Sequence, residues 1–219
     1  MADVVSYSGA GDAERRAVLV SRGRRLEYLT IAWNAFEAAV ALASGVVAGS
    51  VALVGFGLDS AIETASALVL LWRLRVDQNA ERREQAERTA HRLVGICFLM
   101  LAAYVAAEAA RDLWLGEHAS RSVPGILIAV AAAIVMPVLG RAKRRVAAQL
   151  GSRAMESDSR QADFCAYLSL ILLVGLTLQW GLGWWWADVI AALVMVPIIA
   201  YEGVKGLRGE GCDDCGCHP

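Results

Sequence analysis

The chain has 219 residues and a formal net charge of −1, and 57% of its residues are hydrophobic. A soluble domain of this size is about 45–50% apolar, so the composition argues against a soluble protein and indicates a membrane protein. Two of the five cysteines lie in apolar segments and the other three at the C-terminal end. This uneven distribution does not fit a disulfide framework.

Six apolar segments follow one another along the chain, each close to the length of about 20 residues that a spanning helix needs. We therefore predict an all-α membrane protein, a bundle of six transmembrane helices in residues 26–204. A cytoplasmic N-terminal segment, 1–25, precedes the bundle, and a cytoplasmic Cys-rich tail, 205–219, follows it. The predicted spans are 28–47, 50–72, 93–115, 123–139, 164–180 and 184–204, and the fifth helix is expected to begin nearer to residue 157.

The basic residues predict the orientation of the bundle. Nineteen of the 21 Lys and Arg residues lie in the N-terminal segment, the second and fourth connections and the tail. Basic residues collect on the cytoplasmic side of a membrane protein, so we expect both termini in the cytoplasm. The Ala- and Arg-rich composition favours a multi-pass protein of a bacterial plasma (inner) membrane.

The first two predicted spans carry polar residues. The first span holds Asn34 and Glu37, for which structural and functional roles have about equal weight. The second span holds Asp59 and Glu63 near its middle, where a single carboxylate costs roughly 2.5–3.5 kcal/mol on insertion scales. Residues four apart lie on the same face of a helix. Two buried carboxylates on one face of a helix carry this insertion cost twice, so we predict that the pair binds a cation, protons or both.

Polar residues also mark the third and sixth predicted spans. The third span contains Glu108, three residues before Arg111, and these two side chains could neutralise each other. The sixth begins with Asp188 beside three tryptophans, which are typical of the membrane interface. We expect Asp188 to cap the sixth helix.

The fifth predicted span opens with four residues that could bind metal. At 100° per residue, Asp158, Gln161 and Cys165 lie within about 60° of one another and form one stripe. Asp163 points the other way, on the side of Arg160, and is interpreted as an ion-pair partner. A buried cysteine is usually a packing residue, but opposite a carboxylate pair its thiolate can act as a soft metal ligand.

These segments resemble the transmembrane domain of the cation diffusion facilitator family, six-helix proton-coupled exporters of zinc and related divalent metals. Gly49-Ser-Val-Ala-Leu53 followed by Asp59-Ser-Ala-Ile-Glu63 is similar to the second helix of that family, which supplies two metal ligands four residues apart. Glu108-Ala-Ala-Arg-Asp-Leu113 is similar to the end of its third helix. Gly183-Trp-Trp-Trp-Ala-Asp188 is similar to its loop into the sixth helix.

The resemblance also implies ligands on the fifth helix, where family members usually carry a histidine and an aspartate four residues apart. Gln161 and Cys165 take those places in one register, and Ser159 and Asp163 take them in the other. An amide is a poor zinc ligand and a thiol a softer one, so the metal is expected to be zinc or a softer ion such as cadmium or cobalt. The ligands that the resemblance implies are Asp59, Glu63, Gln161 and Cys165, with Asp158 and Asp163 as further candidates.

A second departure from the family lies at the C-terminus. Family members usually carry a cytoplasmic metal-binding domain after the sixth helix, which also helps them to dimerise. The residues after Val204 are too few for such a domain. The tail could instead form a tetrahedral soft-metal site, which we favour, or be a frayed end without function. The ligands of that site would be Cys212, Cys215, Cys217 and His218.

These observations predict a proton-coupled exporter of divalent transition or heavy metals that works by alternating access and, as the family implies, forms a homodimer. The alternative is a non-transporting metal-binding or regulatory membrane module that pairs with a full-length relative. An exporter of small organic cations would leave the Cys-rich tail unexplained. We expect no enzyme activity, because no nucleophile has a nearby base. The expected partners are the metal ion, protons and the lipid bilayer, and no nucleic acid.

Overall fold

The computed structural model describes residues 3–76, 80–117, 119–150 and 153–208. These residues form six α-helices and, within those ranges, no strand. The prediction of an all-α, six-helix fold is therefore confirmed. The helices are α1 (Asp3–Ala48), α2 (Val51–Val76), α3 (Ala80–Leu115), α4 (Val123–Leu150), α5 (Arg153–Leu182) and α6 (Ala187–Arg208).

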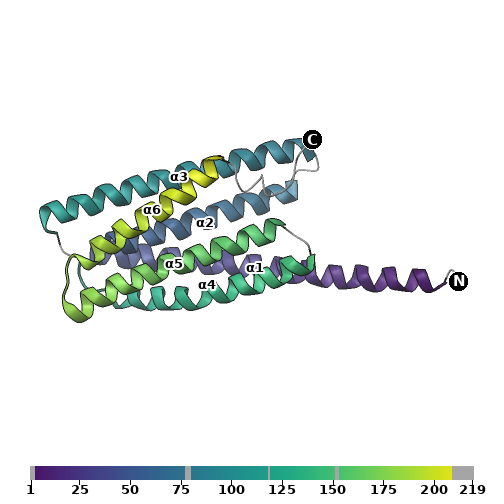
Figure 1. Cartoon of the computed structure of the whole chain (residues 1–219), viewed down its shortest axis with the longest axis horizontal. Coiled ribbons are helices and arrows are strands. Elements are labelled where there is room, and N and C mark those ends of the chain that lie inside the picture. Colours follow the sequence, from purple (N-terminus) through teal and green to yellow (C-terminus); the bar gives the residue numbers. More distant parts are fainter. Residues whose placement is uncertain (1–2, 77–79, 118, 151–152, 209–219) are drawn as a thin grey trace.

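The helices lie side by side along one direction and alternate in sense, while the N-terminal part of α1 projects beyond the others (Figure 1). Within the bundle, α1 packs on α2 and α4, α4 packs on α5, and α3 packs on α6. Helix α1 begins at Asp3, so the expected N-terminal segment is helical and continuous with the first span. The sequence neighbours α1 and α2, and α4 and α5, thus form antiparallel pairs, as short connections require.

The turn between α1 and α2 follows directly from two residues. Gly49 has a φ of 65°, a conformation that costs glycine little, and it ends α1. The backbone N–H of the next residue, Ser50, donates to the carbonyl of Gly45 over 3.0 Å. The Ser50 hydroxyl then accepts a hydrogen bond from the backbone N–H of Leu53 over 3.1 Å and caps the start of α2. This tight turn fixes the register between the first two helices.

Five of the described helical segments are long and apolar enough to cross a membrane. They are 17–48 in α1, 92–115 in α3, α4, 158–182 in α5, and α6. Helix α2 is not among these five segments, but its 26 residues would extend about 39 Å, more than the hydrocarbon core of about 30 Å. On α4, the side chains of Leu127, Ile134 and Val138 are more than half exposed. Such apolar exposure suits a lipid-facing surface.

Candidate metal site

The paired carboxylates of α2 face α1 in the interior of the bundle. Asp59 is 0% exposed and Glu63 is 5% exposed. The amide Nδ2 of Asn34 donates to Oε2 of Glu63 over 2.9 Å. One turn away, the Ser60 hydroxyl donates to Oε1 of Glu37 over 2.6 Å. The pairs Asn34–Glu63 and Glu37–Ser60 fit the same antiparallel alignment of the two helices. The face of α2 that carries Asp59 and Glu63 therefore lies against the face of α1 that carries Asn34 and Glu37.

The α2 carboxylates lack the hydrogen bonds that buried carboxylates normally make. Both oxygens of Asp59 and Oε1 of Glu63 are inaccessible to solvent, and none of them has a hydrogen-bond partner among the described residues. The same holds for Oδ1 of Asn34. Buried polar atoms are almost always hydrogen-bonded in folded proteins, and exceptions need an explanation such as an ion or water that occupies the site. All four atoms are acceptors, so a cation is a group that would satisfy them together.

Glu37 differs from Asp59 because its carboxylate is fully engaged. Its Oε2 accepts a hydrogen bond from Nε1 of Trp33 over 2.7 Å, and its Oε1 accepts one from Ser60. The same Oε1 accepts the Sγ–H of Cys165 from α5 over 3.4 Å. Glu37 therefore links α1, α2 and α5 by hydrogen bonds. This is a structural role, one of the two roles that the sequence allowed for Glu37.

The stripe of Gln161 and Cys165 on α5 faces this region. Cys165 is completely buried and lies among the charges of Glu37, Glu63 and Asp59. The amide of Gln161 interacts with the Glu63 carboxylate. The four residues of the implied transport site therefore lie in one part of the core, with the α2 carboxylates turned away from lipid.

The other two acids of α5 are held by cations of α4. Asp163 forms a bidentate ion pair with Arg144, so it is an ion-pair partner, although of a residue on α4. Asp158 pairs with Lys143, which is 1% exposed and also contacts Oε2 of Glu27 over 3.1 Å. The basic residues of α4 were used only to predict orientation, and nothing in the sequence marks Lys143 as buried. Both acids are thus already neutralised by lysine or arginine.

Within the described ranges, no three His, Cys, Asp or Glu side chains are close enough together to hold a metal ion. The two α2 carboxylates with the buried thiol of Cys165 therefore form a set of donors that would have to draw closer around an ion. The expected tail ligands Cys212, Cys215, Cys217 and His218 lie outside the residues that the structure describes.

Asp188 has a different role from the one that the sequence indicated. It lies inside the first turn of α6, and its Oδ1 accepts a hydrogen bond from the Ser50 hydroxyl over 2.5 Å. The backbone N–H groups of Val51 and Ala52 also donate to this carboxylate. Asp188 therefore caps the N-terminus of α2 rather than α6, and the expectation of a cap on its own helix was wrong. The carboxylate also suits the positive end of the α2 dipole.

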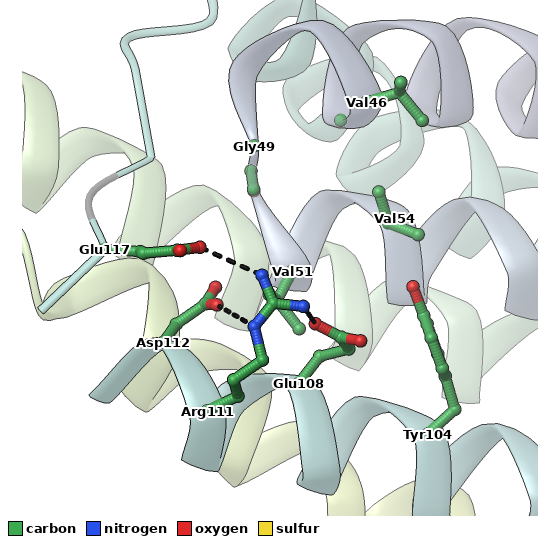
Figure 2. Close-up of a pocket in the computed structure, with 11 residues that line it drawn as sticks. Val46, Gly49, Val51, Val54, Tyr104, Glu108, Arg111, Asp112 and Glu117 are labelled. Carbon is green, nitrogen blue, oxygen red and sulfur yellow. Dashed lines mark hydrogen bonds and ion pairs between the residues drawn. The ribbon is translucent and has the colours of Figure 1, made fainter. Parts of the chain in front are cut away.

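The cavity between the α1–α2 turn and the end of α3 has a volume of about 250 Å³, and three of the residues that line it are acidic (Figure 2). Arg111 occupies its centre and contacts Glu108 at 2.8 Å and Glu117 at 3.0 Å. Nε of Arg111 lies 4.0 Å from Asp112. The expected pair of Glu108 and Arg111 therefore forms, and the same guanidinium also contacts the other two carboxylates, so we do not assign a metal site there.

Comparison with known proteins agrees with this arrangement. Residues 28–209 match the cation efflux transmembrane domain, and this segment is most of the chain. The chain belongs to the cation efflux family. A curated relative, Uncharacterized transporter sll1263 from Synechocystis sp., is 26% identical over 173 residues, which cover 76% of this chain and 56% of the relative. The chain thus spans little more than half the length of this relative. The family membership and the apolar helices make this cation efflux protein a multi-pass membrane protein.

Proposed function

We propose that this cation efflux protein exports divalent transition or heavy metal ions in exchange for protons. The observation that carries the proposal is the buried α2 pair, in which three carboxylate oxygens of Asp59 and Glu63 lack a hydrogen-bond partner. Carboxylates inside a membrane bundle are costly and are typical of ion or proton pathways. The family match to a cation efflux domain agrees with such a pathway.

In this proposal the metal enters from the cytoplasmic end and binds Asp59 and Glu63. Cys165 and Gln161 of α5 complete its coordination as the helices draw together, and the thiol adds affinity for zinc, cadmium or cobalt. The bundle then rearranges so that the site opens to the other side, as in other transporters whose sites lie near the bilayer midplane. Asp163 and Asp158 stay with their α4 partners and do not bind the metal.

Protons would supply the driving force because they compete with metal for the same carboxylate oxygens. Metal binding displaces protons on the cytoplasmic side, and protons that rebind on the other side release the metal. We place the protein in the plasma or inner membrane as a homodimer with both termini in the cytoplasm. This orientation follows from the distribution of Lys and Arg.

Flux in proteoliposomes tests the proposal. Purified protein is reconstituted with a metal-sensitive dye inside the vesicles, and zinc or cadmium uptake is followed with and without a pH gradient. We expect flux that depends on the gradient, that Asp59→Ala abolishes, and that Glu108→Gln leaves within twofold, because Glu108 lies in the separate Arg111 cluster. Equal flux in Asp59→Ala would contradict the assigned site, and flux that ignores the gradient would contradict proton coupling. Metal binding without any flux would indicate the regulatory module instead.

A further inference from the structure

Helix α1 brings to the carboxylate site a polar side chain that the proposed function does not use. Asn34 is 5% exposed, and its Nδ2 donates to Oε2 of Glu63 over 2.9 Å. A carboxylate only accepts hydrogen bonds, so the amide nitrogen must face Glu63 and the amide oxygen must point elsewhere. That oxygen, Oδ1, is buried and has no partner among the described residues.

The unpartnered oxygens come from adjacent side chains of one hairpin. Oδ1 of Asn34, Oε1 of Glu63 and both oxygens of Asp59 are the buried acceptors without partners in the part of the chain that the structure describes. The hairpin register that pairs Asn34 with Glu63 places Ala38 opposite Asp59. An alanine side chain supplies no hydrogen-bond donor. Ala38 therefore cannot satisfy the oxygens of Asp59, whereas a divalent cation can bind all four acceptors.

We propose that Asn34 is a ligand of the transported metal through Oδ1, beside the carboxylates of Asp59 and Glu63. In this arrangement Nδ2 of Asn34 holds one oxygen of Glu63 and leaves the other free for the ion. The proposal rests on the function proposed above and adds a third helix, α1, to the site. It also assigns an oxygen-preferring ion such as Mn²⁺ as a further cargo beside the softer ions, because carboxylate and amide oxygens suit such an ion.

The position of Cys165 supports a site in which the oxygens of α1 and α2 bind the ion and the thiol of α5 is not required. Its Sγ lies 3.4 Å from Oε1 of Glu37 and donates to that carboxylate, whereas the four oxygens of Asn34, Asp59 and Glu63 named above have no hydrogen-bond partner among the described residues. An oxygen-preferring ion can therefore bind between α1 and α2 without the thiol. Loss of Cys165 should then affect a soft ion such as Cd²⁺ far more than Mn²⁺.

Asn34 could instead matter only as a hydrogen-bond donor that joins α1 to α2. Two substitutions separate these roles. Asn34→Asp keeps a side-chain oxygen and removes the amide donor, whereas Asn34→Leu removes both. Thr30→Val is the matched control on α1, because Thr30 is buried and its hydroxyl donates to the Leu26 carbonyl of its own helix over 3.0 Å, away from the carboxylates of α2.

The experiment is calorimetric titration of the purified full-length protein with Mn²⁺ in detergent. All variants carry serine at the three tail cysteines and alanine in place of His218, so that only the membrane site is measured. We expect Asn34→Leu to weaken Mn²⁺ binding at least tenfold and Asn34→Asp to bind Mn²⁺ as tightly as the parent or more tightly. Thr30→Val should stay within twofold of the parent. Size-exclusion profiles establish that each variant is folded, and Asn34→Ala replaces Asn34→Leu should that variant aggregate.

Three results would overturn the ligand role. Unchanged Mn²⁺ affinity in Asn34→Leu would show that the amide oxygen does not bind the ion. An equal loss in Asn34→Asp and Asn34→Leu would show that only the donor to Glu63 matters. A parent protein that binds Cd²⁺ but not Mn²⁺ would refute the assigned cargo. In each case, loss of metal flux in Asp59→Ala would leave the proposed transport function intact, so the two proposals fail separately.

Discussion

Asp59 and Asp188 are both buried to within 1% of full burial, yet their surroundings are opposite. Asp188 accepts hydrogen bonds from Ser50 and from two backbone N–H groups at the start of α2. Asp59 has no hydrogen-bond partner within the described structure. A carboxylate that stabilises a fold is surrounded by donors, whereas one kept for a ligand is left without them. This contrast separates a structural acid from a binding acid more clearly than burial alone.

The contrast predicts opposite effects of the same isosteric change. Asp188→Asn should lower the free energy of unfolding by about 1–3 kcal/mol, because it weakens charge-assisted hydrogen bonds and leaves buried donors poorly paired. Asp59→Asn should leave the stability of the metal-free protein unchanged or raise it, because it removes a buried charge that has no partner. Thermal unfolding in detergent with a metal chelator measures both. A loss in Asp59→Asn as large as that in Asp188→Asn would show that Asp59 is also structural.

At the scale of the helices, α3 and α6 cross with their backbones almost in contact. A Cβ atom built on Gly95 of α3 would lie 2.7 Å from the carbonyl oxygen of Gly203 on α6. Small residues permit this approach, which lets two helices gain van der Waals contact where lipid offers no hydrophobic driving force. The α3–α6 pair thus depends on the absence of two side chains.

Gly95→Ala should therefore destabilise the protein by about 1–3 kcal/mol, because the added methyl group must push two backbones apart. Gly181→Ala is the matched control, since a Cβ at Gly181 near the end of α5 meets no atom within 4 Å. The control should be neutral or slightly stabilising, as alanine favours helix over glycine. Thermal unfolding of both variants provides the comparison. Equal stability of the two would mean that α3 and α6 can separate without cost.

Local periodicity explains why part of the site could be predicted from the sequence. Asp59 and Glu63 share a face because they are four residues apart in one helix, and this needs no knowledge of other helices. The ion pair of Asp163 with Arg144 and the cap that Asp188 places on α2 could not be predicted in the same way. They join residues on different helices, and a single sequence does not show which helices are neighbours. The position of Lys143 was hidden for the same reason, inside a basic run that indicated only orientation.

At the scale of the whole molecule, the polar groups of the interior separate into distinct sets. The site oxygens and Glu37 lie where α1, α2 and α5 meet, with cysteine and amide side chains around them. The ion pairs of Lys143 and Arg144 join α4 to α5, and Lys143 also contacts Glu27 of α1. Cations of the protein therefore neutralise the acids of one set and leave the acids of the other without a lysine or arginine partner in the described structure. A divalent ion bound at the α2 carboxylates would offset the two charges of Asp59 and Glu63.

We expect the three cysteines and the histidine of the tail to form a metal site that is independent of the membrane site. Replacing these residues, Cys212, Cys215 and Cys217 by serine and His218 by alanine, should lower the bound zinc or cadmium by about one ion per chain, because one tetrahedral site takes four such ligands. Flux through the membrane site should persist, because its donors lie on α1, α2 and α5. Elemental analysis of the purified protein gives the metal content, and proteoliposome uptake gives the flux. Loss of flux as complete as in Asp59→Ala would instead place the tail on the transport route, as an obligatory carrier that delivers metal to the carboxylates.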